Sequence, residues 1–215
     1  MNYFAHGCRF TDRPFFLVGT ALPDLLSVVD RQVRLRERRV SPCATGSGEP
    51  HAEIAAGVLQ HFADDAWFHR APAFFEVSGE LTRLFRAALA GDDGHRPALL
   101  GHIVTEMLLD GILIAREPAR LEAYYAAFDQ IDPQIVEHAV NGMARHATDR
   151  LAAFIPLFCR ERFLGDYLDA ESLLWRLNQV LRRVKLHPLP AATRTVLDAG
   201  WTIVEQNLSA LLPGF

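Results

Sequence analysis

Apolar residues recur along the chain at intervals of three and four positions, separated by short polar segments that contain Gly, Pro and Asp. This spacing is typical of amphipathic helices, and it predicts helices over residues 15–29, 57–70, 74–90 and 98–115. No segment alternates apolar and polar residues over the length of a strand. The pattern therefore predicts an all-α fold, and with no internal linker we expect one domain over residues 1–215.

Turn-forming residues divide the predicted helices. Pro23 predicts that the first helix restarts there, with Asp24 in its first turn, where the helix dipole favours an acidic group. Residues 41–50 (SPCATGSGEP) predict a mobile loop over about residues 40–50, and residues 91–97 (GDDGHRP) predict a turn. Four later helices are predicted after Pro118, from Asp132-Pro133, from Asp169, and in a last segment that runs to about Leu212.

The predicted helix over residues 57–70 carries ionisable groups on its apolar face. His61, Asp65 and His69 follow one another at four-residue intervals, so they share an arc of about 80°. Gln60 and Asp64 are expected to point the other way. Because ionisable groups on an apolar face are costly unless they are paired or bound to a metal, this stripe predicts one half of a metal site.

A second stripe with the same spacing lies on the predicted helix over residues 98–115. This helix is apolar nearly all round, which is typical of a buried position, yet it carries His102, Glu106 and Asp110. The alternative interpretation is a set of buried groups satisfied by hydrogen bonds. If the two helices pack side by side, the two stripes converge.

The ligand types predict the class of metal and of chemistry. Imidazoles and carboxylates without a thiolate favour Mn²⁺ or Fe, with Mg²⁺ or Zn²⁺ as alternatives, over a structural zinc site. Such a site is typical of metal-assisted hydrolysis of a phosphoester. The spacing alone does not separate a phosphodiesterase from a di-iron oxidase, but the latter requires two ExxH motifs, and the sequence has none.

Composition and charge indicate the compartment and the classes of partner to expect. A net charge of −4 gives no overall attraction to nucleic acid or to an anionic membrane. The three cysteines form no CxxC pair, which favours a reducing compartment. With no signal-peptide pattern and no apolar run long enough to span a membrane, we expect a cytoplasmic protein. Residues 31–39 (RQVRLRERR) predict either a solvated helix face or a docking surface for an acidic partner.

Several motifs resemble those of one enzyme family, in the same order along most of the chain. They are MNYFAH (residues 1–6), GTALPD (19–24), AGVLQH followed by Asp65 (56–65), EMLLDGIL (106–113), and Tyr167, Asp169, Leu177-Asn178 and Arg183. This set resembles the acyl carrier protein phosphodiesterases, a divergent helical branch of the HD-domain metal hydrolases. The resemblance implies an HD-domain-like bundle and removal of 4′-phosphopantetheine from holo-acyl carrier protein with a cation such as Mn²⁺.

The resemblance also implies roles for individual residues. It adds His6 and Asp24 to the candidate set and supports His61, Asp65 and Asp110. The sequence departs from the family where His69 and Glu106 each replace an aspartate, where Gly111 replaces a histidine, and where Phe62 replaces an arginine.

The leading hypothesis is a metal-dependent phosphodiesterase. Its predicted metal ligands are His6, His61, Asp65, His69, His102 and Asp110, and Asp24 or Glu106 would activate water. Its predicted contacts with an acidic carrier protein or a phosphate group are Arg34, Arg38, Arg182 and Arg183. Two alternatives remain: a helical binding protein on the same scaffold that has lost catalysis, and a hydrolase of another phosphoester such as a nucleotide.

Overall fold

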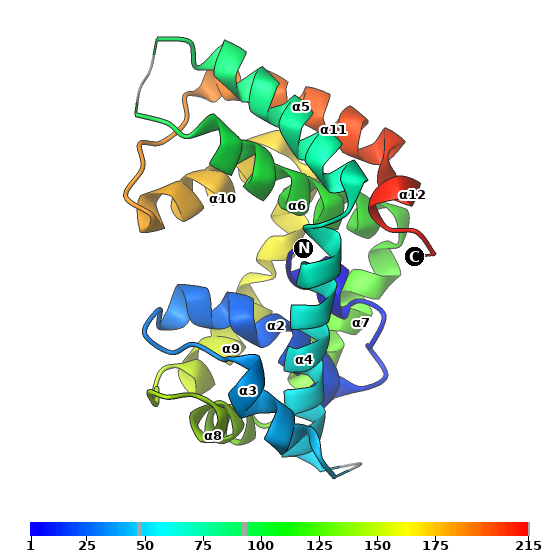
Figure 1. Cartoon of the computed structure of the whole chain (residues 1–215), viewed down its shortest axis with the longest axis vertical. Helices are drawn as coiled ribbons and strands as arrows, with labels where there is room; N and C mark the ends of the chain where they lie inside the picture. The colour runs from blue at the N-terminus through cyan, green and yellow to red at the C-terminus, as the bar shows by residue number, and fades with distance from the viewer. Residues whose placement is uncertain (47–48, 92–93, 215) are drawn as a thin grey trace. The chain divides into compact units, whose positions relative to one another are not determined.

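The computed structural model describes residues 1–46, 49–91 and 94–214, and all regular structure in these ranges is helical (Figure 1). The all-α prediction is therefore confirmed. The α-helices are α1 (Tyr3–Gly7), α2 (Pro14–Val29), α3 (Glu37–Val40), α4 (Pro50–Phe68), α5 (Pro72–Ala88), α6 (Pro97–Arg116), α7 (Pro118–Asp129), α8 (Pro133–Met143), α9 (Leu151–Glu161), α10 (Ala170–Arg183), α11 (Arg194–Gln206) and α12 (Leu208–Leu211). Three 3-10 helices join them: η1 (Ser41–Ala44), η2 (Phe163–Leu168) and η3 (Ala191–Thr193).

Proline and aspartate define many of the helix starts. A proline is the first residue of α2, α4, α5, α6, α7 and α8, where its fixed φ suits a helix and its missing N–H leaves no bond unmade. The predicted caps are confirmed: the Asp132 side chain accepts from the backbone N–H of Gln134, and that of Asp169 accepts from Ser172.

The chain forms two compact units. Unit 1 contains Met1–Ala66 and Glu117–Phe163, and unit 2 contains Trp67–Arg116 and Leu164–Phe215. One domain over residues 1–215 stays a prediction.

In unit 1, α1, α2, α7 and α9 pack on one another around an aromatic core. Phe4, Tyr124, Phe128 and Phe158 are all nearly or fully buried, and the rings of Phe4 and Tyr124 lie 5.6 Å apart. The Tyr124 hydroxyl donates to the backbone carbonyl of Tyr3, which ties the first helix to α7. The start of the chain is thus fixed within the core of unit 1.

In unit 2, α6 packs against α5 and α11, and these helices run side by side in Figure 1. Among the described residues, α6 alone is long and apolar enough to cross a membrane, and 67% of its apolar window is buried within the protein. A core helix passes the same test, so α6 gives no firm evidence of a membrane span. Its burial agrees with the central position that its sequence predicts.

Several predicted boundaries were wrong. Helix α2 continues through Pro23 instead of restarting, because the proline φ is compatible with a helix and the buried face from Phe16 to Leu26 offsets the lost hydrogen bond. The solvated helix face predicted as one interpretation of residues 31–39 was wrong for residues 31–36, which are not helical. Helix α3 begins only at Glu37.

Two predicted loops are described only in part. The predicted loop over about residues 40–50 contains η1, and residues 47–48 lie outside the described residues, as do residues 92–93 of the predicted 91–97 turn. The predicted last helix is divided at Asn207 into α11 and α12.

Candidate metal centre

The site in unit 1 begins with a close crossing of α2 and α4. Gly19 and Gly57 face each other there, and a Cβ on Gly57 would lie 2.1 Å from the carbonyl oxygen of Phe16. A Cβ on Gly19 would lie 2.3 Å from the carbonyl oxygen of Ile54. Neither position can carry a side chain without moving a helix backbone. The crossing brings His61, one turn after Gly57, against the backbone of α2.

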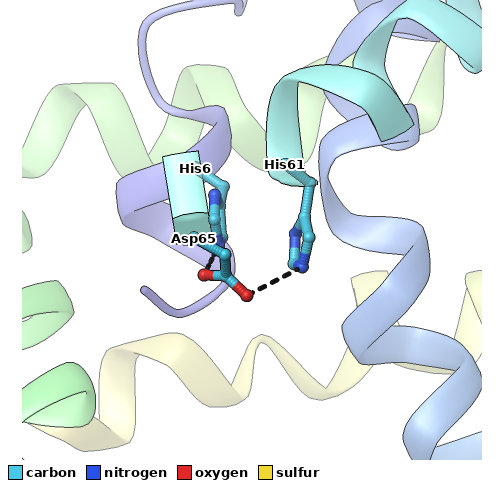
Figure 2. Close-up of side chains that lie close together, drawn as sticks. All are labelled: His6, His61 and Asp65. Carbon is cyan, nitrogen blue, oxygen red and sulfur yellow. Dashed lines mark ion pairs between the residues drawn. The ribbon is translucent and has the colours of Figure 1, made fainter. Parts of the chain in front are cut away.

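His61 is anchored to that backbone. Its Nδ1 donates to the carbonyl oxygen of Thr20 at 2.8 Å, and the residue is only 4% exposed. Because the proton lies on Nδ1 in this contact, Nε2 of the neutral ring carries the lone pair. Nε2 lies 3.5 Å from Oδ2 of Asp65, one turn further along α4 (Figure 2). A histidine that binds a metal is held in this way, with its other nitrogen bonded to an acceptor.

His6, from α1, completes a triad with His61 and Asp65. It is fully buried, and its Nε2 lies 3.3 Å from Oδ1 of Asp65 (Figure 2). Its ring stacks on that of His61 with centroids 4.0 Å apart. The three donor atoms all lie within 4.8 Å of one another.

Asp64 supports His6 from the other side of the ring. His6 Nδ1 lies 3.4 Å from Oδ2 of Asp64, whose Oδ1 accepts a hydrogen bond of 2.8 Å from the Gln60 amide. The expectation that Gln60 and Asp64 point away from the site was wrong for Asp64, which is only 9% exposed. Helix α1 packs on this side of α4 and gives Asp64 a partner. Both imidazoles therefore have one nitrogen held by an acceptor and the other directed at Asp65.

The electrostatics of the triad favour a bound cation. Burial lowers the pKa of His6, but its hydrogen bonds to Asp64 and Asp65 outweigh burial and raise that pKa to about 9. Burial and the positive charge of His6 together lower the pKa of His61 to about 3. Burial alone would raise the pKa of Asp65, yet the bonds from His6 and the Met1 amine hold it well below its usual range. The triad thus holds a carboxylate, a neutral imidazole and a protonated imidazole.

A metal ion fits this donor set, since it can replace the proton of His6. The Met1 α-amino group donates to Oδ1 of Asp65 at 2.7 Å, so a metal ion must also displace this ammonium group or bind through Oδ2.

Asp24 lies near this triad but is not one of its three converging donors. It is half-buried in α2. Its negative charge raises the pKa of His6, by less than the hydrogen bonds to Asp64 and Asp65 do. Its predicted role as a general base stays a prediction.

Unit 2 holds a second group of the predicted residues. His69, just after the end of α4, meets His102 and Glu106 of α6. His69 Nε2 lies 2.7 Å from Oε1 of Glu106, and His102 Nε2 lies 3.4 Å from the same oxygen. The expected convergence of the two stripes is thus observed within unit 2 for His69 with His102 and Glu106.

Asp110 is fully buried on α6, and it is not among the donors that converge in either triad. A helix turns by about 40° more than one full turn over four residues, so Asp110 lies further around the helix than His102. Its predicted role as a ligand stays a prediction. At the next position, a Cβ on Gly111 would lie 2.8 Å from the Tyr167 carbonyl oxygen and 3.0 Å from the Trp201 ring. No histidine fits there.

The predicted arginines lie at the surface. Arg34 and Arg38 are exposed in unit 1, and Arg182 and Arg183 are exposed in unit 2 at the end of α10. Sequence reasoning missed two supports of the first triad, the Thr20 carbonyl and the Asp64 carboxylate. Thr20 acts through its backbone, so its side chain gave no signal.

Comparisons with protein-family models, curated proteins and solved structures found no match for this chain.

Proposed function

We propose that the protein is a metal-dependent phosphodiesterase on an HD-domain-like helical scaffold. One observation carries the proposal: His6 and His61 each have Nδ1 held by an acceptor and Nε2 directed at the Asp65 carboxylate. Two imidazoles and a carboxylate are suitable ligands for Mn²⁺ or Fe²⁺. The sequence motifs that resemble acyl carrier protein phosphodiesterases support a phosphodiester as the substrate class.

A divalent ion held by His6, His61 and Asp65 would supply Lewis-acid chemistry, polarising a phosphoryl oxygen and lowering the pKa of water. The residues of the chain position and neutralise the reactants. His6, His61 and Asp65 would hold the ion. The Asp64 carboxylate and the Thr20 carbonyl orient the His6 and His61 rings, respectively. Asp24 accepts the proton of the attacking water, a role that suits a half-buried carboxylate close enough to influence His6.

The proposed substrate is the phosphodiester between 4′-phosphopantetheine and a serine of holo-acyl carrier protein. Carrier proteins of this kind are acidic, and Arg34 and Arg38 offer exposed positive charge in unit 1. We expect Arg34→Glu with Arg38→Glu to raise KM for holo-carrier protein about tenfold and to leave KM for a small phosphodiester unchanged. Arg182→Glu with Arg183→Glu tests the other predicted pair in the same way.

The experiment is hydrolysis of bis(p-nitrophenyl) phosphate and of holo-acyl carrier protein by the purified protein with Mn²⁺, Fe²⁺, Mg²⁺ or Zn²⁺. Asp65→Asn and His61→Ala are expected to lower kcat at least about 100-fold. The matched control is His146→Ala, which replaces an exposed histidine of unit 1. If the wild-type protein hydrolyses neither substrate with any of these ions, the proposal is wrong.

A second candidate is a binding protein without catalysis, and the packing at Gly111 favours it. The enzyme family has a histidine at this position, and the Tyr167 carbonyl leaves no room for one here. This alternative expects holo-carrier protein to bind without release of phosphopantetheine. Steady release that Asp65→Asn abolishes would contradict it.

A further inference from the structure

The three residues of the second triad present their donor atoms at distances close to those of a metal site. In a tetrahedral site with metal–ligand distances of about 2.0–2.2 Å, two ligand atoms lie about 3.3–3.6 Å apart. His102 Nε2 and Glu106 Oε1 are 3.4 Å apart. His69 Nε2 is closer to that oxygen, at 2.7 Å, a hydrogen-bond distance that must widen when an ion binds between the two atoms. All three donors lie within 4.8 Å of one another.

Aromatic packing holds the two imidazoles of this triad in place. The Phe74 ring meets the His69 ring and the His102 ring edge to face, with centroids 5.0 Å away in each case. The Phe68 ring packs on His69 from the end of α4, at 5.7 Å. Rings fixed in this way lose little side-chain freedom when they bind an ion, which favours binding.

The charge of the triad also favours a cation. Oε1 of Glu106 lies 2.7 Å from His69 Nε2 and 3.4 Å from His102 Nε2, and the Glu106 side chain is only 16% exposed. A carboxylate in partly apolar surroundings is stabilised by a nearby positive charge.

The triad is open to solvent on its histidine side. The side chains of His69 and His102 are 32% and 42% exposed. Three protein ligands leave at least one coordination position for water or a small anion. An ion can therefore reach the donors without opening the fold.

We infer that His69, His102 and Glu106 form a second metal centre, which binds its own first-row divalent ion. Two imidazole nitrogens disfavour Mg²⁺ and Ca²⁺, which take oxygen ligands, and Zn²⁺ is the probe because it binds nitrogen and oxygen sets of this kind more tightly than Mn²⁺ or Fe²⁺ does. The inference does not depend on phosphodiester hydrolysis.

The test counts ions in the full chain. The protein is stripped with a chelator, reloaded with Zn²⁺ and desalted, and bound zinc is measured per chain. In a His61→Ala, Asp65→Asn background, which removes the first triad, we expect about one Zn²⁺ per chain to remain. Adding His102→Ala or Glu106→Gln should weaken Zn²⁺ binding at least about 100-fold. His187→Ala, which replaces an exposed histidine of unit 2, is the matched control and should change nothing.

Co²⁺ gives a second measurement that separates ligand loss from misfolding. In the same background, Co²⁺ should give visible d–d absorption that His69→Ala and His102→Ala abolish while far-ultraviolet circular dichroism stays unchanged. If Zn²⁺ stoichiometry and Co²⁺ absorption are the same with and without the second triad, the inference is overturned. Phosphodiesterase assays decide the proposed function separately, because this test reads bound metal alone.

Discussion

The Nδ1–H of His61 donates to the main-chain carbonyl oxygen of Thr20 over 2.8 Å, which links α4 to α2 across their closest approach. Because the acceptor is a backbone atom, the contact depends on how near the two helices lie and not on the side chain at position 20. It leaves Nε2 of His61 to face Asp65. The orientation of the His61 ring, and with it the position of Nε2, therefore depends on how closely α2 and α4 pack.

Gly57→Ala tests this link. The added Cβ would meet the Phe16 carbonyl oxygen at 2.1 Å, so α2 and α4 must separate. We expect the free energy of unfolding to fall by on the order of 3 kcal/mol, as in overpacked cores, and the His61–Thr20 hydrogen bond to lengthen. Urea denaturation measures the first effect.

Gly79→Ala is the control for that variant. Gly79 also lies within a helix, α5, but a Cβ there meets nothing within 4 Å. Alanine is a better helix former, so this change should stabilise the protein by about 0.5–1 kcal/mol. Equal effects of the two variants would contradict the role given to the crossing.

Asp64→Asn tests the support of His6. Asparagine keeps an oxygen near His6 Nδ1 but removes the negative charge, so the pKa of His6 should fall from about 9. Metal affinity at the first triad should fall about 10–100-fold, as when other partners of a ligating histidine are removed. NMR titration of the metal-free protein and Mn²⁺ binding measure the two effects. Asp149→Asn, at an exposed aspartate of unit 1, should leave both unchanged.

The sequence predicts the helices well because periodicity records which face each helix buries. It also predicts His61 with Asp65, and His102 with Glu106, because each pair lies one turn apart on a single helix. These contacts follow from helix geometry alone. No tertiary information is needed for them.

Contacts between helices were harder to predict. Asp64 follows the polar side of α4 in the sequence, and only the packing of α1 gives it His6 as a partner. The spacing of residues on α4 places His69 with His61 and Asp65, but at the end of the helix it meets His102 and Glu106 instead. A helical wheel records direction around one axis and carries no information on which neighbour covers each turn.

The pH dependence of stability should have a maximum near pH 6.5 in the metal-free protein. His61 has a folded pKa of about 3, below its unfolded value of 6.5, so its contribution is present above pH 6.5 and is lost as the pH falls toward 3. His6 has a folded pKa of about 9, so its contribution is present below pH 6.5 and is lost as the pH rises toward 9. Urea denaturation between pH 4 and pH 9 gives the curve.

His6→Asn separates the two limbs of that curve. The difference in unfolding free energy between wild type and this variant should shrink as the pH rises from 6.5 to 9. The fall in unfolding free energy below pH 6.5 should also be smaller in this variant, since the charge of His6 helps to lower the pKa of His61. A constant difference across this range would show that the His6 pKa is not raised.

Binding of a metal by the first triad should release a proton. At pH 7.5 His6 is protonated, since its pKa is about 9. An imidazole must lose this proton before its nitrogen can bind a metal. His61 is already neutral and Asp65 is already ionised at this pH, so neither adds to the count. We expect about one proton released per ion at pH 7.5, and fewer as the pH rises past 9.

Calorimetry in buffers of different ionisation enthalpy measures this number. A Glu106→Gln variant restricts the titration to the first triad, and Mn²⁺ is the probe. His6→Asn removes the protonated ring and should reduce the release to nearly zero, even where a weakened site still binds. One proton released by that variant would mean that the displaced proton comes from another group, such as the Met1 amine that contacts Asp65.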